Sequence, residues 1–103
     1  MTVEAMIHYM LEEWGTEPMV INSGLCFAFA RQLRDHLRKY GMSGEVHNSD
    51  ILAPADETLP GHAFYTFEGR HYDAEAPSGV VDWRTLPIFL RAAGASQDNR
   101  PPA

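Results

Sequence analysis

The chain has 103 residues, of which 45% are hydrophobic and 21% charged. This length suits one domain, and the composition is that of a folded protein rather than a disordered one. The formal net charge is −6, and because an acidic surface repels phosphate backbones, we expect no direct nucleic-acid binding. The first residues show no basic segment followed by an apolar run, and no apolar stretch is long enough to cross a bilayer, so we expect neither an export signal nor a membrane association.

Cys26 is the single cysteine of the sequence. It cannot form an internal disulfide, which fits a reducing compartment, and we expect a cytoplasmic protein. Without a partner thiol, Cys26 is either a small buried side chain of the core or a nucleophile.

Two helices are predicted in the first half of the chain. Thr2 can cap a helix that runs to about Trp14, and Gly15 ends it. Its apolar stripe consists of Val3, Ile7, Met10 and Trp14. A second helix is expected at about residues 24–40, with Asn22 and Ser23 as candidate N-caps. The apolar face of this second helix contains Cys26, Phe29, Ala30, Leu33, Leu37 and Tyr40. This places the cysteine in the first helical turn, on the side that faces the rest of the protein.

The second half of the chain predicts a small antiparallel sheet. A strand at about residues 45–49 is followed by a loop over residues 50–61, which contains two prolines and several acidic residues. Two aromatic-rich runs, 62–67 and 70–75, are separated by Glu68 and Gly69, a strong signal for a β-hairpin. Asp82 is a candidate cap for a short helical turn at 83–86. We therefore expect a single α+β domain over residues 1–93 and a flexible tail over 94–103.

The expected position of Cys26 gives its thiol special chemistry. The dipole and unpaired amides of a helix start favour the thiolate and lower the thiol pKa. The same amides can donate to an oxyanion that forms beside the sulfur. The alternative is that Cys26 is simply a small buried hydrophobic residue, as lone cysteines often are.

The hairpin supplies a candidate base with two candidate acids. With a two-residue loop, Phe67 pairs with Arg70, and counting back places His62 opposite Glu75. Asp73 lies on the same face, diagonal to His62. A carboxylate beside an imidazole fixes its tautomer and stabilises the imidazolium. The alternative is a histidine at the start of a strand that pairs with an acid only for solubility.

Residues 22–76 resemble the papain-like and transglutaminase-like cysteine hydrolases. The segment Gly-Leu-Cys-Phe-Ala-Phe-Ala at 24–30 is similar to the papain-type Gly-Ser-Cys-Trp-Ala-Phe-Ser around the nucleophile. His62-Ala63 with the aromatic residues after it resembles the strand that carries the histidine, and residues 69–75 resemble the following strand that carries the acid. The order of cysteine, histidine and acid is also that of the family. The resemblance implies a papain-like or transglutaminase-like core, with a cysteine-bearing helix packed on a small antiparallel sheet beside the N-terminal helix.

The resemblance also implies roles for individual residues. Cys26 matches the nucleophile and His62 the general base, while Glu75 matches the acid best and Asp73 is its rival. Papain-like enzymes carry a glutamine shortly before the cysteine to complete the oxyanion hole, and Val20 stands at that place here. Asn22 can substitute for it, or can serve only as a helix cap.

Two classes of function follow. The first is a hydrolase or acyltransferase that uses a Cys-His-acid triad on an amide, isopeptide or thioester bond of a protein or peptide and needs no cofactor. The second is an inert binding protein that keeps the fold, such as a phage-type inhibitor of a host protein, whose acidic surface suits a basic partner. No metal site is expected, because His47, His71, Asp73 and Glu75 show no helical His-x-x-x-His spacing and no thiol lies near them in the sequence.

Overall fold

A computed structural model of the chain describes residues 1–98. It is an α+β fold with one four-stranded antiparallel sheet, in the order β1-β2-β3-β4. The strands are β1 (Glu45–Asn48), β2 (Ala63–Phe67), β3 (Arg70–Asp73) and β4 (Ala76–Val80). The helices are α1 (Val3–Trp14), α2 (Pro18–Ile21), α3 (Cys26–Arg38), α4 (Ser49–Leu52) and α5 (Pro87–Asp98), with a 3-10 turn η1 at Trp83–Thr85. None of the helices in residues 1–98 is both long and apolar enough to cross a membrane.

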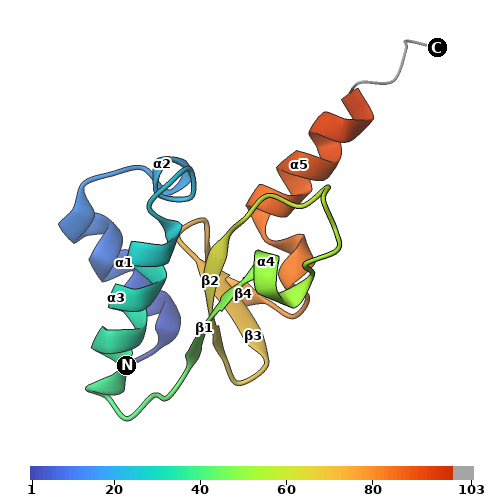
Figure 1. The fold of residues 1–103 in the computed structure, drawn as a ribbon. Helices are drawn as coiled ribbons and strands as arrows, with labels where there is room; N and C mark the ends of the chain where they lie inside the picture. Colours follow the sequence, from blue (N-terminus) through green and yellow to red (C-terminus); the bar gives the residue numbers. More distant parts are fainter. Residues whose placement is uncertain (99–103) are drawn as a thin grey trace.

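Helices cover both faces of the sheet (Figure 1). On one side, α1 and α3 pack around Tyr65 of β2 and form the larger core cluster. On the other side, Phe64 of β2 packs with Leu86 and Phe89, at and just after the start of α5. Neighbouring residues of a strand point to opposite faces of the sheet. Tyr65 therefore packs in the core cluster on one face, and Phe64 packs in the cluster on the other.

The first helix and its stripe are confirmed. Thr2 caps α1 by accepting a hydrogen bond from the Ala5 amide at 3.0 Å, and Gly15 ends the helix with a left-handed backbone. Val3, Ile7 and Met10 are buried. The apolar spacing therefore located this helix and its buried face correctly.

The predicted caps of the cysteine helix are wrong, although the helix itself is confirmed. It begins at Cys26, and Leu25 at the N-cap position makes no side-chain hydrogen bond. Asn22 instead ends α2, and the Ser23 hydroxyl donates to the Met19 carbonyl at 2.8 Å. The reason is that a short helix, α2, precedes α3 and was not predicted. A turn connects the two helices, and in it the Leu25 amide donates to the Ile21 carbonyl at 2.8 Å. This turn takes up the residues that were expected to cap α3.

The hairpin of β2 and β3 has the predicted two-residue loop. Phe67 pairs with Arg70 and Tyr65 with Tyr72. Glu68 and Gly69 have φ values of 49° and 77°, and two consecutive positive φ angles are the requirement of the tight turn that suits the twist of a hairpin.

The C-terminal half differs from expectation in two places. A short helix, α4, lies inside the predicted loop, where the Asn48 side chain accepts from the Asp50 amide at 2.9 Å. The tail expected from Gly94 is helical as far as Asp98, because α5 continues through it, and residues 99–103 lie outside the described part of the chain. The cap that Asp82 was expected to provide for the turn at η1 is confirmed.

Candidate active site

His62 is fixed in place just before β2. Its amide donates to the Ser49 hydroxyl at 2.9 Å, and its carbonyl accepts from the Ser49 amide at 3.0 Å. The imidazole is only 1% exposed and packs edge-on against the Phe89 ring, with the ring centres 5.7 Å apart. The backbone and the ring are therefore both held, which leaves the imidazole little freedom to rotate.

Asp73 is the acid that contacts this imidazole. Its Oδ2 lies 2.9 Å from His62 Nε2, and its side chain is buried. Its Oδ1 accepts from the amides of Glu75 and Ala76, each at 2.9 Å. Asp73 is thus held by hydrogen bonds on both oxygens, in the orientation that presents Oδ2 to the ring.

The prediction that Glu75 lies opposite His62 is wrong. The strand β3 ends at Asp73, which pairs with Ala76 of β4, so Glu75 lies in the tight turn between these strands. The two amides that donate to Asp73 Oδ1 hold this turn closed. Asp73, the rival, therefore takes the place beside the ring, and the Glu75 carboxylate is directed instead toward Arg91, with oxygen–nitrogen distances of 2.6 and 2.8 Å.

Cys26 is the first residue of α3 and is half-buried. The pKa of the Cys26 thiol is lowered, chiefly by the neighbouring His62 imidazole, with further help from the amides of Ala63 and Phe27, while burial acts in the opposite direction. Burial alone would lower the pKa of His62, but Asp73 and Cys26 outweigh it and raise that pKa to about 9. A thiolate beside an imidazolium is therefore the favoured state of the pair.

The second ring nitrogen of His62, Nδ1, has no hydrogen-bond partner among residues 1–98. Nε2 is used by Asp73, and the buried Nδ1 makes no hydrogen bond of standard geometry with any described residue. The thiol and the ring are therefore neighbours rather than fully aligned hydrogen-bond partners, an arrangement common in catalytic pairs without a ligand. Nδ1 is the atom left to exchange a proton with the sulfur.

Asn22 joins the site, but not as a cap of α3 or as an oxyanion donor. It is buried, and its Nδ2 donates to Glu75 Oε1 at 2.8 Å and to Asp73 Oδ2 at 3.2 Å. A side-chain amide has two N–H groups, so both are already used. Val20, at the place of the papain-type glutamine, is 52% exposed and has no donor to offer. The donors left for an oxyanion are the backbone amides of the first turn of α3, which have no acceptor within the helix.

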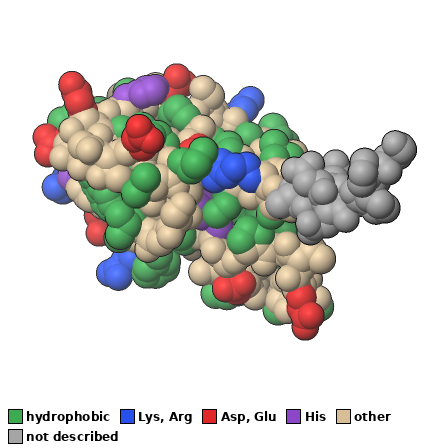
Figure 2. Space-filling model, turned by 90° about the horizontal axis from the view of Figure 1, so that it is seen from above, with side chains coloured by type: hydrophobic (Ala, Val, Ile, Leu, Met, Phe, Trp, Pro, Cys, Tyr) green, Lys and Arg blue, Asp and Glu red, His purple; other side chains and the backbone are tan. Residues whose placement is uncertain are grey.

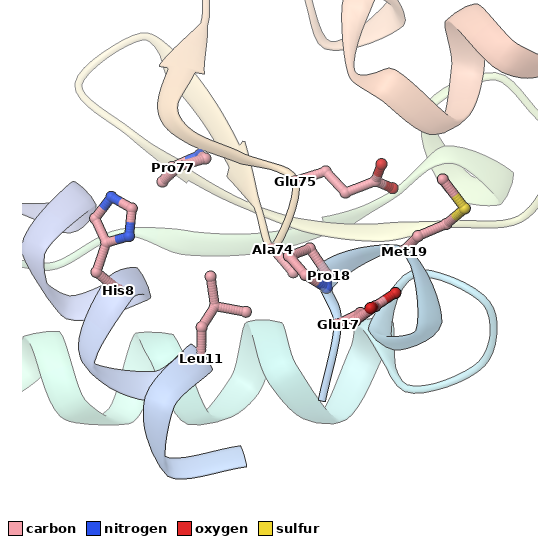
Figure 3. Close-up of a pocket in the computed structure, with 8 residues that line it drawn as sticks. All are labelled: His8, Leu11, Glu17, Pro18, Met19, Ala74, Glu75 and Pro77. Atoms are coloured by element: carbon pink, nitrogen blue, oxygen red, sulfur yellow. The ribbon is translucent and has the colours of Figure 1, made fainter. Parts of the chain in front are cut away.

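The molecule has a pocket whose lining includes neither the thiol nor the imidazole of the site. Figure 2 looks onto the end of the molecule that carries α2 and shows a histidine in a depression beside a basic side chain. Glu75 is one of the residues that line a pocket of about 570 Å³ (Figure 3). Its lining residues are His8, Leu11, Glu17, Pro18, Met19, Ala74, Glu75 and Pro77. Since neither Cys26 nor His62 lines this pocket, it does not hold the reactive groups.

The other titratable residues of the sheet take no part in this arrangement. His71 Nδ1 lies 2.8 Å from the Thr66 hydroxyl, and His47 lies 3.6 Å from the Glu45 carboxylate. Within residues 1–98, no three side chains of His, Cys, Asp or Glu are grouped so that they could hold a metal ion.

Comparison with known proteins gives no relative. No protein-family model matches the chain, and no curated protein or solved structure is significantly similar to it. A function is therefore inferred from the geometry of the residues themselves.

Sequence reasoning missed Arg91 and Ser49. Arg91 reaches Glu75 from α5, and Ser49 holds the backbone of His62 from the start of α4. Neither carries a local signal, because an arginine in an amphipathic run and a serine after a strand are ordinary in sequence. Only the folded arrangement shows what they contact.

Proposed function

We propose that the protein is a thiol-dependent hydrolase or acyltransferase that acts through Cys26, His62 and Asp73. The observation that carries this proposal is the hydrogen-bonded pair of buried side chains, His62 and Asp73, beside a half-buried thiol with a lowered pKa at the start of a helix. This arrangement has the three parts of a nucleophilic triad: an activated sulfur, a base and a group that orients the base.

The chemistry proceeds in two steps. The Cys26 thiolate attacks the carbonyl carbon of an amide, isopeptide or thioester, and the protonated His62 gives its proton to the leaving amine or thiol. The acyl group is then bound to sulfur. His62, now neutral, takes a proton from water or from an acceptor amine, which attacks the thioester and releases the thiol. Asp73 keeps Nε2 protonated throughout and stabilises the imidazolium.

A protein or peptide substrate is favoured by the surroundings of the sulfur. Leu25 and Phe27 flank Cys26 in the chain, and both are exposed. Large apolar side chains on a surface are a common feature of sites that bind apolar segments. We propose that the acyl side of the substrate, an apolar segment of a chain, lies along these residues.

Covalent trapping tests this function. An activated p-nitrophenyl ester should acylate Cys26, and intact-mass measurement should show one adduct that disappears slowly as it hydrolyses. The variants Cys26→Ala and His62→Ala should form no adduct at neutral pH, while the variant Arg38→Met, changed on the exposed side of α3, should behave as the wild type. Acylation that persists in His62→Ala would show that the ester reacts without the triad.

One observation favours the second candidate, an inert binding protein with a basic partner. Both N–H groups of Asn22 are committed to carboxylates, and Val20 offers no donor, so the oxyanion site has no side-chain donor from these two positions. Loss of one such donor typically costs a factor of about 100 to 1,000 in rate. Acylation of Cys26 no faster than that of an ordinary thiol, with no turnover, is the result expected of this candidate.

A further inference from the structure

Glu75, Asn22 and Arg91 form a continuous chain of hydrogen bonds that ends on the catalytic acid. Arg91 donates two hydrogen bonds to the Glu75 carboxylate, at 2.6 and 2.8 Å. Glu75 Oε1 also accepts from Asn22 Nδ2, and the same nitrogen donates to Asp73 Oδ2, the oxygen that contacts His62. The chain links α5, the turn between β3 and β4, and the end of α2.

Resting on the proposed function, we infer that Asn22, Glu75 and Arg91 are positioning residues that fix Asp73, and through it His62, and that they couple the C-terminal helix to the reactive site. None of the three touches the reacting atoms. Their role is to hold the acid in the one orientation that serves the imidazole.

Asn22 is placed to hold two carboxylates together. Each of its two N–H groups donates to a different carboxylate, so the amide cannot rotate without losing both bonds. Its Oδ1 is buried and makes no hydrogen bond with the described residues, which costs stability. The two bonds to charged acceptors offset that cost, and they fix the separation between Asp73 and Glu75.

Arg91 favours the charged form of Glu75. A guanidinium that donates two hydrogen bonds to a carboxylate stabilises its charged form. The bidentate contact with Arg91, opposed by burial and assisted by Asn22, holds the pKa of Glu75 below its ordinary value. Glu75 is therefore occupied by Arg91 and does not compete with Asp73 for the imidazole.

The alternative is a surface ion pair without consequence for the site. Exposed pairs contribute little, commonly below about 1 kcal/mol. The Glu75 side chain, however, is only 13% exposed, and its Oε1 is shared between Arg91 and Asn22. These two facts distinguish it from the pair of Asp35 and Arg38 on α3, where both side chains are more than half exposed.

The inference is tested with variants that remove the chain of hydrogen bonds but leave the net charge of the protein unchanged. The first is Asn22→Leu, and the second is the double variant Glu75→Met with Arg91→Met. In both, the rate of Cys26 alkylation by iodoacetamide at neutral pH should fall about tenfold, and the midpoint of its pH profile should rise. Combining all three changes should add little to Asn22→Leu, because the residues act in series. The single variant Glu75→Gln keeps an oxygen that accepts from Asn22. It should therefore retain most of the wild-type rate of Cys26 alkylation.

The matched control is the double variant Asp35→Met with Arg38→Met, which removes an ion pair elsewhere and should leave the profile unchanged. If Asn22→Leu does not fold by circular dichroism, the Glu75 and Arg91 double variant decides the question alone. Folded variants with the wild-type profile overturn this inference while leaving the proposed function intact. A wild-type protein with the profile of an ordinary thiol overturns both.

Discussion

At the scale of residues, the site depends on which carboxylate holds the imidazole. Asp73 contacts His62 Nε2 directly, while Glu75 lies in the next turn and contacts Arg91 and Asn22. The two acids are two positions apart in the chain and both carry carboxylates, so their different contacts come from their positions in the fold. The difference between them can be measured as a difference in the alkylation rate of Cys26.

The variants Asp73→Asn and Glu75→Gln should differ strongly. The side-chain amide that replaces the carboxylate in Asp73→Asn presents either a donor or an uncharged oxygen to His62, so the imidazolium loses its counter-charge and the thiolate becomes less stable. The alkylation rate of Cys26 at neutral pH should fall about tenfold or more, whereas Glu75→Gln should remain within about threefold of the wild type. Iodoacetamide labelling followed by mass spectrometry measures both rates. Equal losses in the two variants contradict the assignment of Asp73 as the acid.

The ion pair of His62 and Asp73 should also make stability depend on pH. Asp73 and Cys26 together raise the pKa of His62 from 6.5 to about 9, so the folded state favours the charged ring. Since the folded pKa lies above the unfolded one, this contribution is complete below pH 6.5 and is lost as the pH rises through about 9.

Urea unfolding of the wild type and of His62→Gln across this pH range measures the contribution. The difference in the free energy of unfolding should be largest at the acidic end and should shrink toward the alkaline end. A difference that grows as the pH rises contradicts the raised pKa.

The positions of Cys26 and His62 in the fold were predictable from sequence, but the carboxylate that contacts the imidazole was not. Cys26 follows a turn and begins an amphipathic helix, and His62 directly precedes an aromatic strand, so local patterns located both. The acid depended on where β3 ends. Asp73 stops the strand because its own Oδ1 accepts from the Glu75 and Ala76 amides, and counting along an unbroken ladder cannot reveal a side chain that closes the next turn.

At the scale of elements, local signals worked where they were strong. The turn at Glu68 and Gly69 gave the register of the hairpin, and the apolar stripe gave α1. They failed for α5, because Gly94 and the small residues around it weaken the helical pattern. The start of α5 is held instead by tertiary contacts, since Phe89 packs on Phe64 and on the edge of Trp83, and Arg91 binds Glu75.

The extent of α5 gives a test at this scale. Gly94 lies inside the helix, and no atom is within 4 Å of the position that a Cβ would take. The substitution Gly94→Ala should therefore raise the free energy of unfolding by as much as about 1 kcal/mol, because alanine loses less backbone freedom in a helix. Gly15→Ala is the contrasting variant, since Gly15 also has open space around it but has a φ of 60°, and it should destabilise the protein. No gain from Gly94→Ala in thermal or urea unfolding is the result expected if the chain is already irregular at that point.

At the scale of the whole molecule, the site lies where three elements meet. The sulfur comes from the start of α3, the imidazole from the residue before β2 and the carboxylate from the end of β3 (Figure 1). These residues are far apart in the sequence, so His62 can lower the pKa of Cys26 only when the sheet and α3 are packed together. An unfolded chain has the same residues but no site.

The pH profile of Cys26 alkylation tests the central claim most directly, namely that His62 activates this thiol. Because the chain has one cysteine, all labelling by iodoacetamide reports on this residue. The native protein should react at a pH well below that needed by the same protein in urea, and His62→Ala should shift the native profile toward the unfolded one. Native and unfolded profiles with the same midpoint, or a His62→Ala profile identical to that of the wild type, would contradict the account.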